Sequence, residues 1–291
     1  MCIRDSLYTG LTHAREPLSM MNLFYFVQKL LEQNESDLES NFIVNNRELW
    51  FIPVINPDGY AYNEFIEPNG GGMHRKNRFD NGCGDGTGRG VDLNRNYGYG
   101  WGSDNSGSSP DECSEIYRGE SAFSEIETQS IRDFILDNQF KNILHYHSYS
   151  NVYIHAFGDG SMPNEPEITT LTDIGNEMAK YNGYSVGTGS EVIGYSVNGD
   201  AVDWTFGEQG IIAFTPEIGT PNQGFWPSEN EIIDLCEDQF YSNKIFAFTA
   251  GPDIILKSYN LPENMISEGE DEVEIEILIE NRGLSLSLIH I

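Results

Sequence analysis

The stretch Leu49-Trp50-Phe51-Ile52-Pro53-Val54-Ile55 is a continuous apolar run with the length of a β-strand. An uninterrupted run of this kind is typical of a strand that is covered on both faces, as in sheets flanked by helices. Other strand-length segments are predicted at Asn142–His147, Val152–Phe157 and Ile211–Thr215. The chain is therefore expected to build a sheet whose central strands are buried.

Amphipathic helices are predicted between these strands. Pro17 suits a first helical turn, and apolar residues then recur at the spacing of a helix that packs on a core: Met20, Leu23, Phe24, Val27, Leu30 and Leu31. A capping box at Ser124–Glu127 predicts a second helix, and Glu229–Phe248 predicts a closing one. A further helix is expected with these apolar residues on one face: Leu171, Ile174 and Met178. The alternation of strands and helices predicts an α/β domain with a mixed, largely parallel sheet flanked by helices.

The α/β pattern ends near Gly251, and an alternating apolar and acidic segment, Val273–Glu280, follows it. Such alternation predicts a half-buried strand, so residues 252–283 are interpreted as the start of a truncated β-sandwich domain. The first domain is expected over residues 7–251. Residues 1–6 and 284–291 do not continue the neighbouring patterns, and we interpret them as errors of a fragmentary gene model.

The chain has 46 acidic and 16 basic residues, which leaves a formal net charge of −30. This balance argues against nucleic acid or an anionic membrane as the partner, because both require a basic face. An acidic exterior is well solvated and could also bind Ca²⁺. No apolar run of about 18 residues is present, so no membrane span is predicted.

Residues 66–120 contain few apolar runs and many Gly, Asn, Ser and Asp residues, which indicates a long functional loop region. Cys83 and Cys113 bracket part of this region, where a disulfide would restrict the loop. Cys236 lies in a helical pattern and is expected to be a buried thiol.

The stretch His13-Ala14-Arg15-Glu16 places an imidazole and a carboxylate three residues apart, on one side of a helical turn. These are ligands that Zn²⁺ accepts at a catalytic site. A third ligand could come from His145 or His147, which lie two residues apart at the end of a predicted strand, and spacing does not choose between them. Taken singly, each histidine could equally be a core residue bonded to the backbone.

Glu217 follows the predicted strand Ile211–Thr215, where a partly desolvated carboxylate could act as a general base. With 46 acidic residues in the chain, it could also be an ordinary surface side chain. The basic residues of Arg75–Arg78 and Asn94-Arg95 are concentrated in an acidic protein, which indicates an anion site. A local ion-pair network with nearby Asp residues is the alternative.

Together these segments resemble the zinc metallocarboxypeptidases of the carboxypeptidase A type, and among them the secreted bacterial members. The similarity runs from about Leu7 to Gly251. Six motifs in the family's order carry it: Thr12–Glu16, Asn56–Tyr60, Arg75–Arg78, Gly90–Asn96, His147–Ser150 and Phe214–Glu217. The resemblance implies an eight-stranded sheet that lacks its N-terminal edge strands here, a disulfide between Cys83 and Cys113, and a secreted enzyme that is monomeric.

The resemblance also implies the catalytic residues. It assigns one Zn²⁺ to His13, Glu16 and His147. Glu217 is implied as the general base and later proton donor, and Arg78 as the residue that polarises the scissile carbonyl and stabilises the oxyanion.

The substrate-binding residues follow in the same way. Asn94 and Arg95 are implied as the clamp on the C-terminal carboxylate. Tyr195 matches the mobile tyrosine that closes over bound substrate, and Arg15 and Tyr149 match contacts to the residue before the scissile bond.

Val202 occupies the implied floor of the specificity pocket, which favours an apolar or aromatic terminal residue, whereas the nearby Asp200 could accept Lys or Arg. The expected function is hydrolysis of the C-terminal peptide bond of peptides and proteins. Two alternatives are an amidohydrolase of the same fold that acts on a cell-wall or non-peptide amide, and a non-catalytic cell-surface binding module. Loss of a ligand or of Glu217 would be the signature of the latter.

Overall fold

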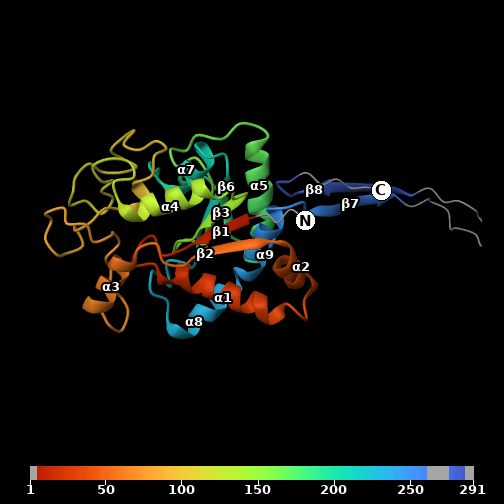
Figure 1. The fold of residues 1–291 in the computed structure, drawn as a ribbon, viewed down its shortest axis with the longest axis horizontal. Helices are drawn as coiled ribbons and strands as arrows, with labels where there is room; N and C mark the ends of the chain where they lie inside the picture. Colours follow the sequence, from red (N-terminus) through yellow and green to blue (C-terminus); the bar gives the residue numbers. More distant parts are fainter. Residues whose placement is uncertain (1–4, 261–274, 286–291) are drawn as a thin grey trace, which may run out of the picture.

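The computed structural model of the protein describes residues 5–260 and 275–285. Its main body is an α/β domain around a six-stranded sheet with the order β2-β1-β3-β6-β4-β5 (Figure 1). The strands are β1 (Asp5–Thr9), β2 (Glu48–Ile52), β3 (Asn142–His145), β4 (Val152–Ile154), β5 (Ser185–Gly187) and β6 (Ile212–Glu217). All neighbours are parallel except β4 and β6. The predicted class is therefore confirmed. In the described residues this sheet has six strands, and the expected sheet was one of eight that lacks its N-terminal edge strands.

Helices cover both faces of the sheet. They are α1 (Pro17–Gln33), α2 (Leu38–Asn46), α3 (Pro57–Ile66), α4 (Ile126–Asp137), α5 (Glu167–Met178), α6 (Gly189–Val192), α7 (Ala201–Gly207), α8 (Glu229–Glu237) and α9 (Phe240–Thr249), with a 3₁₀ turn η1 (Leu93–Arg95). Figure 1 shows α4 and α7 on one side of the sheet and α1 and α8 on the other.

Alternation along the central strands creates two cores. In β1, Tyr8 packs with α1, α5 and α9, while its neighbour Leu7 packs with α4 and α7. The same division separates Leu144 from Ile143 in β3. Successive side chains of a strand point to opposite faces, so each of these apolar strands supplies both cores.

Helix α1 buries a different stripe from the predicted one. Phe26 is fully buried, whereas the predicted core residues Phe24 and Leu31 are 54% and 60% exposed. Two overlapping apolar stripes run along this helix, and docking on the sheet selects the one that contains Leu23 and Phe26.

Helix starts account for several differences from the predicted elements. The run at Leu49–Ile55 forms a strand only to Ile52, and this half-buried strand lies at the edge of the described sheet. The segment after it, expected as a turn, begins α3, because the Asn56 side chain accepts a hydrogen bond from the Gly59 N–H. Asn and Pro in this order are also a helix-start signature.

Three other boundaries differ. The polar segment before β2 contains a short helix, α2, whose first turn is capped by the Asp37 carboxylate. The capping box predicted at Ser124–Glu127 is absent: Glu125 is the residue that precedes α4, and the Ser124 hydroxyl donates to its carboxylate. The closing helix is divided into α8 and α9 between Glu237 and Phe240.

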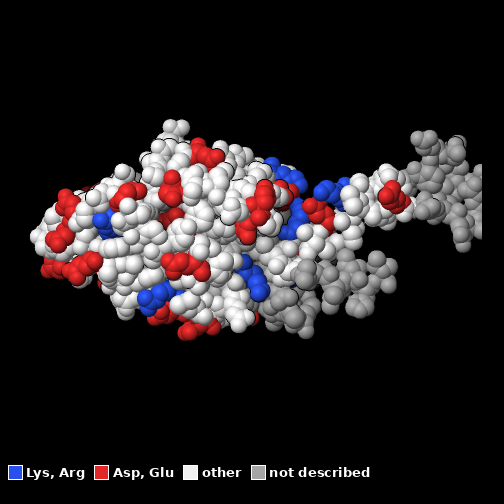
Figure 2. All heavy atoms as spheres, turned by 90° about the horizontal axis from the view of Figure 1, so that it is seen from above, with Lys and Arg blue, Asp and Glu red and all other residues white. Residues whose placement is uncertain are grey.

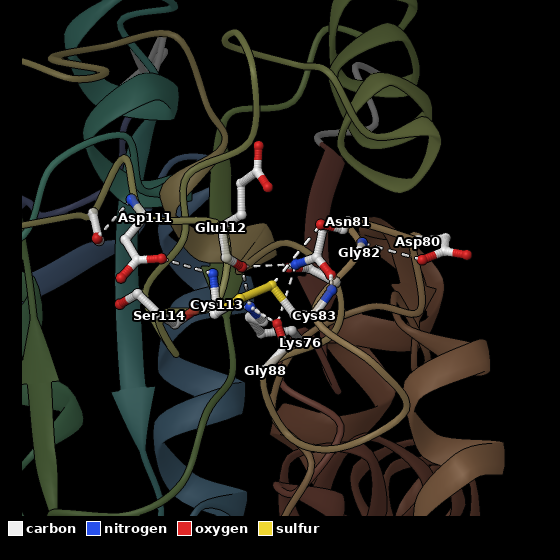
Figure 3. Close-up of a disulfide and its surroundings, with 12 residues drawn as sticks. Lys76, Asp80, Asn81, Gly82, Cys83, Gly88, Asp111, Glu112, Cys113 and Ser114 are labelled. Carbon is white, nitrogen blue, oxygen red and sulfur yellow. Dashed lines mark hydrogen bonds between the residues drawn. A yellow bond between two sulfur atoms is a disulfide. The ribbon is translucent and has the colours of Figure 1, made fainter.

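Beyond Ile66, the last residue of α3, the loop region to residue 120 contains only η1 and an isolated β-bridge between Ser109 and Tyr117. The disulfide predicted between Cys83 and Cys113 is present, and Figure 3 shows it beside Lys76 and Asn81. The buried Lys76 ammonium donates to the carbonyls of Gly88, Glu112 and Ser114. Asn81 donates to the first two of these carbonyls as well. The loop region is thus held together by a covalent bond and a polar cluster. Outside it, Cys236 is a buried free thiol, as predicted.

A separate antiparallel pair, β7 (Ile254–Asn260) and β8 (Glu276–Asn281), extends away from the main body (Figure 1). It lies in the region interpreted as the start of a second domain, of which residues 261–274 are outside the described residues, as are 1–4 and 286–291. Asp5 and Ser6, which the sequence pattern placed outside the first domain, belong to its strand β1.

The surface agrees with the composition. Figure 2 shows acidic side chains spread over the visible face and few basic ones among them. None of the helices in the described part of the chain is long and apolar enough to span a membrane.

The two phenylalanines of α1 provide a matched test of this packing. Phe26→Ala is expected to lower the free energy of unfolding by about 3–5 kcal/mol, because it leaves a cavity in the core. Phe24→Ala should cost less than about 1 kcal/mol, since most of its ring is already in solvent. Denaturant unfolding of both variants measures the difference, and equal losses would contradict the assigned face.

Candidate active site

The candidate residues meet at the carboxyl ends of three adjacent strands. His13 follows β1, His147 follows β3, and Glu217 is the last residue of β6. Parallel neighbours end at the same edge of a sheet, and open α/β sheets bind ligands there. An isolated backbone pairing between His147 and Glu217 lies beyond the last residue of β3, at the last residue of β6.

The local structure of the first pair differs from the expected one. His13 and Glu16 lie in a turn closed by the Glu16 N–H and the His13 carbonyl at 3.1 Å, before the first residue of α1. They therefore do not share a helical turn, and the prediction made from their spacing is wrong on this point. The turn nonetheless brings the His13 Nδ1 within 2.8 Å of Glu16 Oε1.

Three buried side chains converge at this point: His13, Glu16 and His147. The His147 Nδ1 lies 2.8 Å from Glu16 Oε2 and 3.0 Å from the His13 Nδ1. Within residues 5–260 and 275–285 this is the single group of three His, Cys, Asp or Glu side chains close enough to hold one metal ion.

His145 lies outside this group. Its ring is buried between the hydroxyls of Thr9 and Thr205, at 3.0 and 3.2 Å. Burial lowers the pKa of His145 to about 3, and the neighbouring His147 contributes to the decrease. A neutral imidazole between two hydroxyls is a core residue, which is the alternative that spacing had left open.

A carboxylate that was not singled out from the sequence orients the first histidine. Asp92 is fully buried, and its Oδ1 accepts a hydrogen bond from the His13 Nε2 at 3.1 Å. Its Oδ2 accepts from Arg75 at 2.9 and 3.0 Å. Burial opposes its ionisation, but Arg75 and His13 hold the pKa of Asp92 well below its usual value. The motif Gly90–Asn96 contained this residue, yet only its Asn-Arg pair was assigned a role.

Glu217 is the second unusual carboxyl group. Burial raises its pKa to about 7, and the nearby Glu16 carboxylate adds to the increase. A carboxyl group whose pKa lies near neutrality can both accept and return a proton.

His13, Glu16 and Glu217 border a cleft of about 280 Å³, and His147 is not among the side chains that line it. Besides His13, Glu16 and Glu217, the predicted site residues that line it are Arg15, Asn94, Arg95, Tyr149, Tyr195 and Asp200. Side chains that were not predicted also contribute, namely Arg75, Ile154, Ile193, Val197, Thr215 and Phe225. Tyr195 is 55% exposed at the rim, whereas Arg95 is 95% buried.

Arg78 does not face the cleft, and its predicted role is wrong on this placement. Its guanidinium lies 3.7 Å from the centre of the Tyr62 ring and 3.6 Å from the Asp85 carboxylate. Arg75 faces the cleft instead, 3.9 Å from Glu16 Oε1. The segment is not helical, so residues three apart point in different directions, and the partner Asp92 decides which arginine is turned inward.

Val202 is also not part of the cleft wall. It is 1% exposed and packs in the core between α7 and the sheet. Asp200, the residue that precedes α7, lines the cleft and accepts a hydrogen bond from the Asp203 N–H. The start of α7 therefore presents its capping carboxylate to the cleft and its first apolar side chain to the core.

Comparison with known proteins agrees with this geometry. A family model described as zinc carboxypeptidase matches residues 3–242 of the chain. The chain belongs to the zinc carboxypeptidase family. The carboxypeptidase B of Astacus astacus is 34% identical over 247 residues, which cover 82% of this chain and 78% of that protein. A zinc carboxypeptidase of Simulium vittatum is 32% identical, with coverages of 78% and 74%.

Solved structures of similar proteins have the same fold. The carboxypeptidase A from Helicoverpa armigera gives a TM-score of 0.73 at 30% identity and covers 85% of this chain and 61% of its own. Bovine thrombin-activatable fibrinolysis inhibitor, solved with a tick carboxypeptidase inhibitor, gives 0.73 at 26% identity, with coverages of 85% and 82%. The chain is accordingly a metallocarboxypeptidase, an exopeptidase that acts on peptides.

The donor set fits the zinc that the family implies. Since the carboxylate of Asp92 can only accept, the His13 Nε2 carries the proton and its Nδ1 presents a lone pair. Glu16 is also an acceptor: burial opposes its ionisation, but His13 and His147 lower its pKa. In His147 the Nδ1 is the atom that meets His13 and Glu16, whereas its buried Nε2 has no partner. Three lone pairs that converge within hydrogen-bond distance of one another suit a cation, and the Asp92 contact is the outer support typical of zinc-binding histidines.

Zinc binding should distinguish His145, the last residue of β3, from His147, which follows that strand. His147→Asn is expected to weaken zinc affinity by more than about 100-fold, which exceeds the usual effect of losing an outer partner. His145→Asn should keep the affinity within about tenfold, because its ring faces the two threonines. Competition with a zinc chelator measures both, with circular dichroism as the control for folding. Retention of zinc by His147→Asn would contradict the ligand set.

Proposed function

We propose that this enzyme hydrolyses the C-terminal peptide bond of peptides and proteins, with one Zn²⁺ held by His13, Glu16 and His147. The observation that carries the proposal is that His13, Glu16 and Glu217 line one cleft together with Arg75 and Arg95, and that the buried His147 lies against His13 and Glu16. The complete ligand set and the presence of Glu217 argue against a degenerate binding module.

Zn²⁺ bound there would act as a Lewis acid toward a carbonyl and would lower the pKa of a water molecule. Glu217 acts as the general base. Its buried carboxylate takes a proton from the attacking water and returns it to the amine of the leaving residue. A pKa of about 7 suits both halves of this transfer at neutral pH.

Arg75 takes the role that the sequence had assigned to Arg78. Its guanidinium lies between Asp92 and Glu16, at the side of the cleft next to the donor trio. It polarises the scissile carbonyl and stabilises the negative charge that develops on that oxygen. The ion pair with Asp92 holds it in place before substrate arrives.

Arg95 and Asn94 bind the free carboxylate of the substrate. Arg95 is almost fully buried and has its Nε and one terminal nitrogen on the carbonyls of Gly107 and Asn94, so its remaining donors face the cleft. A terminal carboxylate is the natural partner of this guanidinium. An internal peptide would leave a buried charge unpaired, which makes the enzyme an exopeptidase.

The rim of the cleft contacts the rest of the substrate. Tyr195 closes over the bound terminal residue. Arg15 and Tyr149 contact the residue before the scissile bond. Both pack on Phe225: the Arg15 guanidinium carbon lies 4.4 Å from the centre of the Phe225 ring, and the Tyr149 ring centre lies 4.9 Å from it.

The pocket beyond Arg95 determines which terminal residue is accepted. Ile154, Ile193 and Val197 make much of its wall apolar, which favours apolar and aromatic side chains. Asp200 lies among them, and burial raises its pKa while Arg95 opposes the increase. Its carboxylate would accept the ammonium or guanidinium of a terminal Lys or Arg.

We further infer that residues 7–251 form the catalytic domain of a secreted, monomeric enzyme. The disulfide between Cys83 and Cys113 supports an oxidising compartment. Calcium binding by the acidic surface stays a prediction from composition.

Glu217→Gln tests the central proposal. We expect kcat to fall by about 10²–10⁴-fold, because the amide cannot accept the proton from water, while zinc content stays unchanged. Hydrolysis of a blocked dipeptide with a free C-terminus is the measurement. A Glu217→Gln variant that hydrolyses the peptide with the kcat of the wild type would overturn the assignment of the base.

The two arginines of the Arg75–Arg78 motif form a second pair of variants. Arg75→Ala should lower kcat/KM by about 10²–10³-fold, since an oxyanion donor is lost. Arg78→Ala should change it by less than about threefold, because that side chain lies on Tyr62 outside the cleft. The reverse order would restore the assignment made from the sequence.

A series of blocked dipeptides tests specificity. Those that end in Phe should be cleaved fastest, Lys should be accepted through Asp200, and Glu should be the poorest. A C-terminal amide of the Phe peptide should lower kcat/KM on the order of 100-fold or more, because Arg95 is then unpaired. Preference for Glu would be incompatible with an acidic, apolar pocket.

A further inference from the structure

The orientation of Arg95 depends on a loop that lies outside the cleft. Its Nε donates to the carbonyl of Gly107 at 2.7 Å. Gly107 belongs to the loop region without regular structure, twelve residues after Arg95. An oxygen atom on such a loop can orient a buried guanidinium only if the loop itself is fixed.

The Asp104 carboxylate fixes this loop from one side. Its Oδ1 accepts hydrogen bonds from the N–H groups of Gly107 and Ser106, at 2.8 and 2.7 Å. The hydrogen bond from the Gly107 N–H, and after it the one from the Ser106 N–H, lowers the pKa of Asp104. The carboxylate is therefore ionised at neutral pH. The residue that presents its carbonyl to Arg95 is thus held through its own N–H.

Asn198 fixes the loop from the other side. Its side chain is buried, and its Nδ2 donates to the Asp104 Oδ1 at 3.0 Å. Its Oδ1 accepts from the Ser108 hydroxyl. Gly107 lies directly against it, since a Cβ at that position would be 2.7 Å from the Asn198 Nδ2 and 2.8 Å from its backbone nitrogen. Asn198 therefore touches the loop on both sides of the carbonyl that holds Arg95.

We propose that Asp104 and Asn198 are a pair of positioning residues that set Arg95 for the C-terminal carboxylate of the substrate. Neither contacts the cleft; both act through Gly107. The inference rests on the proposed role of Arg95 and deepens it. Asn198 also lies in the segment between Tyr195 and Asp200, so the pair connects the carboxylate clamp to the wall of the specificity pocket.

A charge exchange tests the pair. Asn198→Asp places a second carboxylate against Asp104, and the repulsion should displace Gly107 and raise KM roughly tenfold for a blocked dipeptide, with kcat within about threefold. Adding Asp104→Asn removes the charge repulsion. The Asp104 Oδ1 that accepts from Ser106 and Gly107 is also the atom to which Asn198 donates, and this last contact is not rebuilt. The amide oxygen still accepts from Ser106 and Gly107, and the Ser108 hydroxyl donates to the new carboxylate. The double variant should therefore recover most of the increase, with KM within about threefold of the wild type.

Asn105→Asp is the matched control. It makes the same chemical change on the same loop at an exposed residue that contacts Arg118 and not the Asp104 carboxylate. Arg118 also donates to the Asp104 carbonyl and the Ser108 hydroxyl, and an added carboxylate at position 105 strengthens its hold on the loop, so KM should not rise. Thermal unfolding of all variants separates a loss of stability from a loss of positioning.

The effect must pass through Arg95. In an Arg95→Ala background, Asn198→Asp should change KM by less than about twofold, although the same substitution raises it in the wild type. The inference is overturned if Asn198→Asp leaves KM unchanged, or if the double variant recovers thermal stability but not KM. If Arg95→Ala itself leaves KM unchanged, the proposed function of Arg95 fails first, and the inference with it.

Discussion

The buried carboxylate of Asp92 is the interaction on which the rest of the site depends. Its two oxygens accept hydrogen bonds from the His13 ring, from the Arg75 guanidinium and from the Asn94 N–H. These donors come from the end of β1, from the loop region and from the first residues of η1. A fully buried anion is costly unless each lone pair is used, so the three segments are held in one arrangement.

The Asp92 carboxylate therefore has three structural roles. It selects the tautomer of a candidate zinc ligand, it aligns the arginine that we propose to act on the scissile carbonyl, and it begins the short turn that carries the proposed clamp for the substrate's carboxylate. The loop region 66–120 has little regular structure of its own, and polar contacts replace the ladders of a helix or sheet. Lys76 with its three carbonyls, the disulfide, and the pair Asp104 and Asn198 all serve the same purpose at different points of the loop.

The sequence predicted the class of the fold because apolar strands and amphipathic helices alternate, and that pattern depends only on local periodicity. Its failures have a common cause. Phe24 and Phe26 both satisfy a helical period, and Arg75 and Arg78 are chemically identical. Asn56 with Pro57 can start either a turn or a helix. In each case the local sequence allows two arrangements, and contacts with the surrounding structure determine which one forms.

The sequence by itself determined which chemical groups are available: two histidines and a glutamate for a metal, a glutamate for proton transfer, and a few arginines in an acidic chain. The motifs also determined the family. The tertiary structure agrees with the family resemblance in grouping His147 and not His145 with His13 and Glu16. Only the tertiary structure decided that Arg75 and not Arg78 faces the cleft, and that Asp200 and not Val202 lines it. The reason is physical: the direction of a side chain is set by partners such as Asp92 and Thr205, which are distant in the sequence and are brought close only by folding.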